Sequence, residues 1–182
     1  MKPSLFAHAR RGLLVLAAAL GLVFGVTAAP AQAQDLALEG VFELRPLHTS
    51  GKCLEVADWS KNDGAAVRQW DCTGGDNQKW ARYSAPGSSR GPYWYINLNS
   101  GKCLEIRDWG THNGAVADQW SCHYGANQTW YGNSGMIYPD YDYAAGKCLE
   151  IADWRTDNGA PARLWDCSYR QDSNQTFYPQ RA

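Results

Sequence analysis

The sequence has few of the residues and spacings on which metal sites and many catalytic sites depend. It holds four histidines, and the three beyond residue 33, which are His48, His112 and His123, do not form the His-x-x-x-His spacing of helical zinc sites. An even number of six cysteines is better explained by disulfides than by free thiols. We therefore predict no enzymatic activity, no metal site and no cofactor.

The sequence also lacks a cluster of basic residues. Lysine and arginine total 17 against 18 acidic residues, and residues 1–33 contain three basic residues but no acidic one. The rest of the chain therefore has a net charge of about −4 at neutral pH. This balance argues against a nucleic-acid partner or an anionic membrane surface, both of which attract basic patches.

One long apolar stretch is present, at the N-terminus. Lys2, Arg10 and Arg11 precede apolar residues 12–29, which end at the small-residue sequence Ala31-Gln32-Ala33. This is the layout of a cleavable signal peptide, and a membrane anchor is the alternative because the stretch is nearly long enough to span a bilayer. We expect cleavage near Ala33, a secreted extracellular protein, and one domain over residues 34–182.

All six cysteines follow the expected cleavage site, where export to an oxidising compartment permits disulfides. They lie in three copies of one unit, in each of which the two cysteines are 19 residues apart. Each copy reads Gly-Lys-Cys-Leu-Glu, then Asp-Trp, Trp-x-Cys and Asn-Gln-x-aromatic. The cysteines are Cys53 and Cys72, Cys103 and Cys122, and Cys148 and Cys167.

Short β-type runs separated by Asn, Asp and Gly fill each copy, without an amphipathic helical stretch. Asn62-Asp63-Gly64, His112-Asn113-Gly114 and Asp157-Asn158-Gly159 supply residues that tolerate positive φ. We predict an all-β domain of three repeats, at about 41–83, 93–132 and 136–180. Because no repeat buries a face alone, they should close around a pseudo-threefold axis.

The tryptophans and glutamines divide by position. In the Gln-x-aromatic segments we expect core residues, because an apolar residue alternates there with polar neighbours. The six residues concerned are Gln78 with Trp80, Gln128 with Trp130, and Gln175 with Phe177. A second set, Trp59, Trp109 and Trp154, either extends a binding surface or packs against the disulfide of its own repeat.

If the two cysteines of a repeat pair across antiparallel strands, Glu55 faces Trp70 and Ala57 faces Arg68. Leu54 and Val56 then point into the core. The same register sets Glu105 against Trp120, Arg107 against Asp118, and Glu150 against Trp165. A carboxylate beside an indole, with the amide of Asn77, Asn127 or Asn174 nearby, suits a sugar ring.

These motifs resemble the ricin-type β-trefoil lectins, over nearly all of residues 34–182. The resemblance implies a β-trefoil with one disulfide in each repeat and a sugar held by an acid, a polar residue, an aromatic ring and an asparagine. The matching residues are Glu55, Arg68, Trp70 and Asn77; Glu105, Asp118, Trp120 and Asn127; and Glu150, Arg163, Trp165 and Asn174.

The chain departs from the family pattern at several of these positions. Glu stands where the family has Asp, and Arg68, Asp118 and Arg163 stand where it usually has Gln. An arginine there either neutralises the carboxylate or donates to sugar hydroxyls. In the second repeat we interpret Arg107 as compensating for Asp118, which leaves Glu105 the least restrained carboxylate. Asn174 lies two residues further from its first cysteine than its counterparts, which predicts a displaced amide.

The leading interpretation is a secreted, monomeric lectin with up to three weak pyranoside sites, for galactoside or xylan-like glycans by resemblance. The alternative is a trefoil that binds proteins, for example an inhibitor of extracellular hydrolases, in which the Glu and Arg pairs serve structure. An enzyme that uses Glu105 and Asp118 as an acid pair is the weakest interpretation, because no contrast in pKa between them is evident.

Overall fold

The computed structural model describes residues 36–88, 91–140, 146–168, 170 and 173–182. The chain divides into two units, Met1–Ala33 and Gln34–Ala182. The predicted signal peptide lies outside the described residues and stays a prediction. Among the described residues, none belongs to a helix long and apolar enough to cross a membrane.

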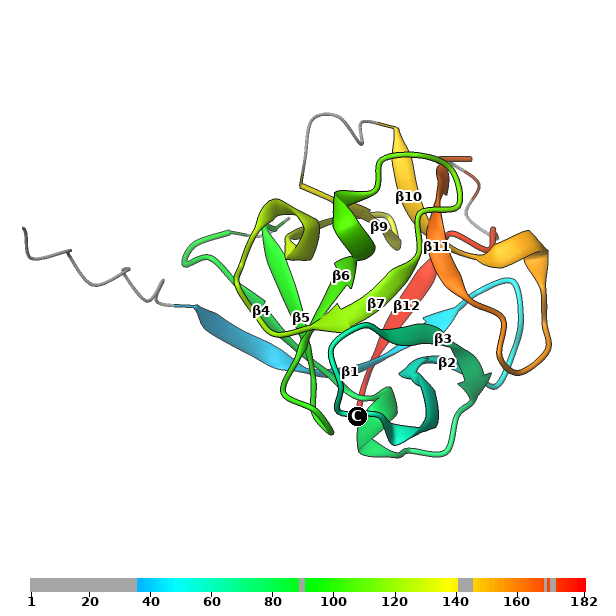
Figure 1. Cartoon of the computed structure of the whole chain (residues 1–182), viewed down its shortest axis with the longest axis horizontal. Coiled ribbons are helices and arrows are strands. Elements are labelled where there is room, and N and C mark those ends of the chain that lie inside the picture. Colours follow the sequence, from blue (N-terminus) through cyan, green and yellow to red (C-terminus); the bar gives the residue numbers. More distant parts are fainter. Residues whose placement is uncertain (1–35, 89–90, 141–145, 169, 171–172) are drawn as a thin grey trace, which may run out of the picture. The chain divides into compact units, whose positions relative to one another are not determined.

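Each repeat contributes four strands, as the spacing of β-type runs predicts (Figure 1). The first repeat holds β1 (Ala37–Pro46), β2 (Lys52–Val56), β3 (Ala65–Asp71) and β4 (Trp80–Ser84). The second holds β5 (Tyr93–Asn97), β6 (Cys103–Ile106), β7 (Ala117–Trp120) and β8 (Trp130–Asn133). The third holds β9 (Met136–Pro139), β10 (Lys147–Ile151), β11 (Ala162–Asp166) and β12 (Phe177–Arg181).

The first and last strands of the repeats form a closed ring. Strand β1 pairs with β12 and β4, β4 pairs with β5, β5 with β8, and β8 with β9. An isolated bridge between Met136 and Thr176 brings the end of the ring back to the start of β12. Closure in this way pairs the outer strands of each repeat with those of its neighbours, which is why repeats that are unstable alone become stable together.

The middle strands form three hairpins, β2–β3, β6–β7 and β10–β11, which bind one another in a cycle. The amide of Gly64 donates to the carbonyl of Gln119 at 2.8 Å, Gly114 to Leu164 at 2.8 Å, and Gly159 to Gln69 at 2.9 Å. The three glycines have φ of 77°, 90° and 88°, so the predicted positive-φ turns are confirmed. This cycle of equivalent bonds is the predicted pseudo-threefold symmetry.

The Gln-x-aromatic segments lie in the core, as predicted. Trp80, Trp130 and Phe177 are buried, and the indole nitrogen of Trp80 donates to the carbonyl of Leu54 at 3.0 Å. Leu54 and Val56 are buried too, which confirms the predicted inward face of β2. Buried indoles keep their hydrogen bonds because an unpaired N–H in an apolar core is costly.

Each repeat carries the predicted disulfide, joining Cys53 to Cys72, Cys103 to Cys122, and Cys148 to Cys167. The register predicted from them is wrong by two residues. Cys53 lies opposite Trp70, because Cys72 follows the last residue of β3 and its sulfur reaches back diagonally.

Glu55 consequently faces Arg68 rather than Trp70. The other repeats show the same displacement, with Glu105 opposite Asp118 and Glu150 opposite Arg163. A shift of two residues preserves the alternation of side chains, so acid, polar residue and tryptophan still share one face of each hairpin.

Candidate functional site

The three glutamates of the predicted sites are buried, and amide side chains donate hydrogen bonds to them. Glu55, Glu105 and Glu150 are 4%, 5% and 4% exposed. In the first repeat, Glu55 Oε2 accepts from Asn77 Nδ2 at 3.2 Å and from Gln78 Nε2 at 3.0 Å. The Gln-x-aromatic glutamines therefore belong to the carboxylate network, a role that the sequence analysis did not assign to them.

The third repeat repeats this geometry despite its longer loop. Asn174 donates to Glu150 Oε2 at 3.1 Å and to the carbonyl of Ile151 at 2.6 Å, as Asn77 does to Glu55 and Val56. The expectation of a displaced amide is wrong, because the two extra residues fall in the loop between Cys167 and Asn174.

In the first repeat an arginine closes the site. Arg68 Nε donates to Glu55 Oε1 at 3.0 Å, and the NH2 group of Arg68 donates to Asp58 at 2.9 Å. The guanidinium carbon lies 4.4 Å from the centre of the Trp70 ring, over its face. Of the two roles open to this arginine, the structure shows the neutralising one, and the cation lies over one face of the indole.

The third repeat has the same closed arrangement. Arg163 Nε donates to Glu150 Oε1 at 2.9 Å, its NH2 group donates to Asp153 at 2.7 Å, and its guanidinium lies 4.4 Å from the Trp165 ring centre. Asp58 and Asp153 are not among the site residues predicted from the sequence. Their recurrence directly before a tryptophan was the available signal.

The second repeat is different, because Asp118 occupies the arginine position. Arg107, from the turn after β6, donates from Nε to Asp118 Oδ2 at 2.7 Å and from NH2 to the carbonyl of Gly64 at 2.8 Å. The predicted compensation of Asp118 by Arg107 is confirmed. Trp120 is 43% exposed, and among the described residues no cation lies over its ring.

The two acids of this site are both perturbed by burial. Asp118 is fully buried, and burial raises its pKa to about 6 although the hydrogen bond from Arg107 opposes the shift. Burial also raises the pKa of Glu105, against hydrogen bonds from Gln128 and His123. Asp118 Oδ1 is buried without a hydrogen-bond partner. The second repeat therefore holds an incompletely satisfied acidic pair.

In the second repeat a histidine lies beside the buried glutamate. His123 Nδ1 accepts from the Gly125 amide at 3.1 Å, so its proton lies on Nε2, which is 3.6 Å from Glu105 Oε2. The imidazole stacks on Trp109, with ring centres 6.3 Å apart and planes at 25°. Trp109, Trp120 and His123 are all exposed or half-exposed around the buried acids.

The Asp-Trp turns are the other feature of each site. Trp59, Trp109 and Trp154 are 54%, 45% and 49% exposed, at the ends of the 3₁₀ turns Ala57–Trp59, Arg107–Trp109 and Ala152–Trp154. These tryptophans lie outside the buried core, in backbone conformations that tryptophan seldom adopts.

Glu43, Cys53 and Cys72 bring one carboxylate oxygen and two sulfurs within 4.8 Å of one another. Both sulfurs are bonded to each other in the disulfide, so they have no thiolate to offer a metal ion. This cluster is therefore a contact of the structure and not a metal centre.

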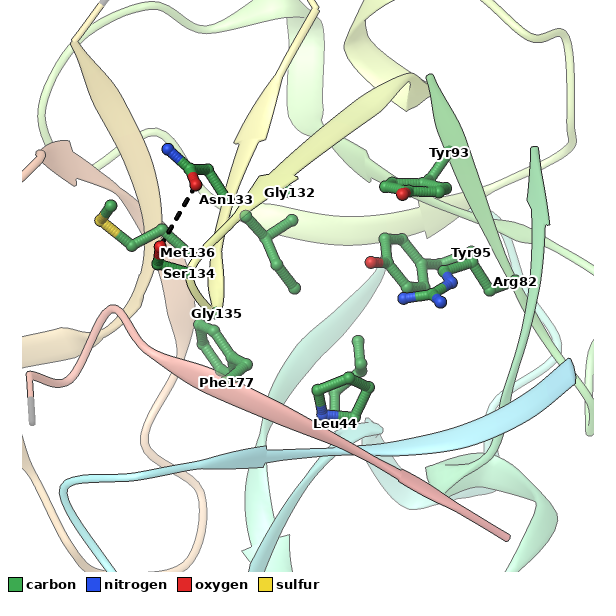
Figure 2. A pocket seen from close by; sticks show the side chains of 12 residues that line it. Leu44, Arg82, Tyr93, Tyr95, Gly132, Asn133, Ser134, Gly135, Met136 and Phe177 are labelled. Carbon is green, nitrogen blue, oxygen red and sulfur yellow. Dashed lines mark hydrogen bonds between the residues drawn. The ribbon is translucent and has the colours of Figure 1, made fainter. Parts of the chain in front are cut away.

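A separate cavity of about 180 Å³ is lined by residues of the strand ring, among them Tyr93, Tyr95 and Phe177 (Figure 2). The first repeat has Phe42 and the second has Tyr93 at equivalent positions of the strand ring, whereas the third repeat has Gly135 there. Gly132 likewise stands where the first repeat has Arg82. Two missing side chains thus explain the space, which no predicted sugar-binding residue lines.

Comparisons with known proteins agree with this architecture. The chain matches the family described as ricin-type beta-trefoil lectin domain-like over residues 32–96 and 82–165. A designed threefold-symmetric protein, ThreeFoil, is 31% identical with a TM-score of 0.67, over 79% of this chain and 100% of the design. An exo-beta-1,3-galactanase from Clostridium thermocellum is 24% identical with a TM-score of 0.67, over 79% of this chain and 30% of that protein.

Among curated proteins, Serine protease 1 of Rarobacter faecitabidus is 42% identical over 45 residues, which are 25% of this chain and 8% of that protein. The chain thus matches a small part of this relative. The family match spans more than half of the chain. The three disulfide-bonded repeats of the chain close around a pseudo-threefold axis. The chain therefore belongs to the ricin-type β-trefoil lectin domain-like family.

Proposed function

We propose that the protein is a secreted, non-catalytic carbohydrate-binding protein whose principal site lies in the second repeat. The observation that carries this proposal is the position of the cations: the guanidinium groups of Arg68 and Arg163 each lie over one face of Trp70 and Trp165, while Trp120 has no cation over it among the described residues, although Trp165 (39%) and Trp120 (43%) are similarly exposed. An exposed indole binds the apolar face of a pyranose by stacking. The family name, and the name of the similar galactanase, support a sugar as the ligand.

The polar groups of the second repeat suit sugar hydroxyls. His123 is half-exposed beside Glu105, and Arg107 is 44% exposed while it pairs with Asp118. A ligand hydroxyl therefore meets a donor and an aromatic surface together, which is the usual composition of a small-molecule site. Galactosides and xylan-like chains are the glycans to test first, with β-1,3-galactan included because of the galactanase.

Catalysis is not part of the proposal. A general acid must reach the proton that it transfers, yet Asp118 is fully buried and Glu105 is 5% exposed under two amide donors. The acidic pair is better placed to orient Arg107 and His123 than to contact a scissile bond. We propose that hydrolysis of any bound polysaccharide is left to other proteins.

The test is retention of the disulfide-bonded protein on β-1,3-galactan, xylan and galactose-bearing supports, with Trp70→Ala, Trp120→Ala and Trp165→Ala in parallel. Removing Trp120 should weaken retention roughly 10-fold, since losing the stacking on an exposed aromatic ring costs about 1.4 kcal/mol. The matched changes at Trp70 and Trp165 should weaken it less than threefold. Retention on none of the supports would end the lectin proposal.

The closed first and third repeats also favour a second candidate function. If Glu55 with Arg68 and Glu150 with Arg163 serve only structure, the trefoil presents a rigid surface to a protein, such as an extracellular hydrolase. This candidate predicts no retention on any glycan and inhibition of at least one hydrolase in a secretome. The glycan panel therefore separates the two functions directly.

Secretion is the remaining part of the proposal. The N-terminal pattern and three disulfides support it, since disulfides persist in oxidising compartments. N-terminal sequencing of the protein from the culture medium should begin near Gln34. A protein that stays in the membrane fraction with Met1 intact would contradict cleavage.

A further inference from the structure

The Asp-Trp turns hold two consecutive residues in the left-handed conformation in every repeat. Trp59, Trp109 and Trp154 have φ of 55°, 55° and 57°, and the preceding aspartates have φ of 54°, 51° and 56°. They make up six of the eight non-glycine residues with positive φ in the described part of the chain. Glycine adopts this conformation without strain, whereas a bulky residue destabilises the fold there.

Because these tryptophans are strained and about half exposed, packing in the core does not explain why tryptophan stands at these positions. Each turn is closed by a backbone bond, such as the Ser60 amide to the Ala57 carbonyl at 3.0 Å, and Asn99 donates to the Trp59 carbonyl at 3.0 Å. The indole of Trp59 rests on the backbone of Gly75, where a β-carbon would come within 2.7 Å of the ring. The ring is thus held rigidly while about half of it faces solvent.

The second repeat supports its tryptophan in the same way. A β-carbon on Gly125 would lie 3.0 Å from the Trp109 ring and 2.7 Å from His123. His123 stacks beside this indole, so two aromatic rings form one platform. Tyr124 follows with φ of 58° and 47% exposure, at the position where the first repeat has Gly74. The second repeat therefore has a third residue in the strained left-handed conformation, and the side chain of this residue is an exposed aromatic ring.

Each platform has a carboxylate next to it. The Asp58 and Asp153 side chains are 82% and 70% exposed even while they bind Arg68 and Arg163. Those arginines join the Asp-Trp turn to the neighbouring strand, which fixes the turn and covers the strand tryptophan at the same time. In the first and third repeats, the turn tryptophan is therefore more exposed than the tryptophan under the arginine.

We infer that Trp59, Trp109 and Trp154 are three stacking platforms through which one polysaccharide chain or surface is bound. The inference rests on the proposed function and adds the residues and the multivalent ligand class. Pyranose rings lie with their C–H faces on the indoles, and the adjacent aspartates accept hydroxyl hydrogen bonds. The Trp109 platform, with His123 and the open Trp120 in the same repeat, is the strongest.

A repeated glycan fits these platforms better than a protein partner does. A stable protein interface needs about 800 Å² per partner around an apolar centre. The three indoles belong to three different repeats, and each is flanked by a charged aspartate. A polymer of identical units matches three equivalent platforms, and simultaneous contact multiplies their weak affinities.

The test uses Trp59→Gly, Trp109→Gly and Trp154→Gly in the full disulfide-bonded protein, singly and combined. Glycine retains the left-handed turn, so these variants remove the ring without disturbing the backbone. On β-1,3-galactan or xylan, whichever retains the unmodified protein, each single change should weaken retention roughly threefold to tenfold, and the triple change ~100-fold or more. Trp109→Tyr, which keeps a ring, should restore most of the loss at Trp109.

A second measurement is made on the unmodified protein, and the variants serve only to assign its signals. The tryptophan Nε–H signals in an ¹H–¹⁵N spectrum are assigned from the signal missing in each single variant. Galacto- or xylo-oligosaccharide should shift the Trp109 signal most and leave the buried Trp80 signal in place.

Unchanged retention of the triple variant, with loss on Trp120→Ala alone, would overturn the inference and leave the proposed function standing. Failure of the unmodified protein to bind any support would overturn both. Trp59 and Trp154 signals that stay fixed at saturating oligosaccharide, while Trp109 shifts, would overturn the claim of three platforms.

Discussion

The second repeat differs from its two neighbours in how an arginine neutralises the buried acids. Each buries a glutamate under two amides, and each has one arginine close to its acids. In the first and third repeats the arginine comes from the strand and covers the tryptophan. In the second it comes from the turn and leaves the tryptophan open. Moving one cation from the second strand of the hairpin to the turn after the first strand thus changes which surfaces remain available to a ligand.

The comparison also shows that sequence similarity between repeats does not establish equal function. The three repeats share their cysteines, glutamates, asparagines and tryptophans, and a motif search counts three identical sites. Under the proposed function, the residue facing the glutamate determines whether a repeat binds sugar, because an arginine there competes for the space and the hydrogen bonds of a sugar. The experiments below change that residue or its surroundings.

The largest effect is expected from Arg68→Ala. This change leaves Glu55 buried with only its amide donors, and losing one partner of a buried ion pair destabilises by about 3–5 kcal/mol. Denaturant unfolding should show this loss, and Arg163→Ala should match it. Lys61→Ala, an exposed control, should change the unfolding free energy by less than about 0.5 kcal/mol. Equal stability of Arg68→Ala and Lys61→Ala would contradict a structural role for the arginine.

A pH-dependent effect is expected at Asp118, which has no counterpart in the other repeats. Its folded pKa of about 6 lies above the ordinary value of 3.8, so its contribution to stability is present below pH 4 and is lost as pH rises through 6. The shift corresponds to ~3 kcal/mol. Unfolding between pH 4 and 7 should therefore show Asp118→Asn gaining stability relative to the unmodified protein by up to that amount.

Asp71→Asn is the matched control for this pH series. The hydrogen bond from Lys52 lowers the pKa of the exposed Asp71 carboxyl, so Asp71 contributes stability at neutral pH that is lost as pH falls through its folded pKa. Its variant should therefore lose stability relative to the unmodified protein as pH rises to about 5, and the difference should then stay level up to pH 7, where the Asp118→Asn difference still grows. Parallel curves for the two variants would contradict the assignment of a raised pKa to Asp118.

Much of this architecture follows from the sequence, because its determinants are local. The 19-residue cysteine spacing, the Asn-Asp-Gly turns and the Gln-x-aromatic segments predicted the repeats, the hairpins and the core. The predicted register is wrong because Cys53 and Cys72 are not directly opposite each other across the two strands. The orientation of Arg68 also could not be predicted, since it depends on Asp58 in a left-handed turn, which no local propensity favours.

The comparison is tested most directly by converting one site into the other. Arg107→Ala with Asp118→Arg gives the second repeat the residues of the first, so the new arginine should pair with Glu105 and cover Trp120. If the proposed function holds, retention on the glycan support should fall at least 10-fold, or ~1.4 kcal/mol, with stability maintained.

The reverse exchange, Ala57→Arg with Arg68→Asp, should uncover Trp70. Made in the protein that already carries the first exchange, it should restore at least part of the lost binding. Retention that follows neither exchange would separate ligand binding from the position of the arginine. Melting temperatures of both double variants serve as the control for folding.

The smallest effect concerns the cavity, where the second repeat again differs from the first. Gly132 stands where Arg82 does, its φ is not in the left-handed region, and an added β-carbon would lie 3.6 Å from Tyr93. Gly132→Ala should therefore stabilise the protein by ~1 kcal/mol, through lower unfolded-state entropy and added apolar burial. Gly135→Ala is the opposing control, because Gly135 has φ of 85° and a β-carbon there would come within 2.8 Å of Thr176. A higher melting temperature for Gly135→Ala than for Gly132→Ala would show that the cavity is a required feature of the fold rather than a site of incomplete packing.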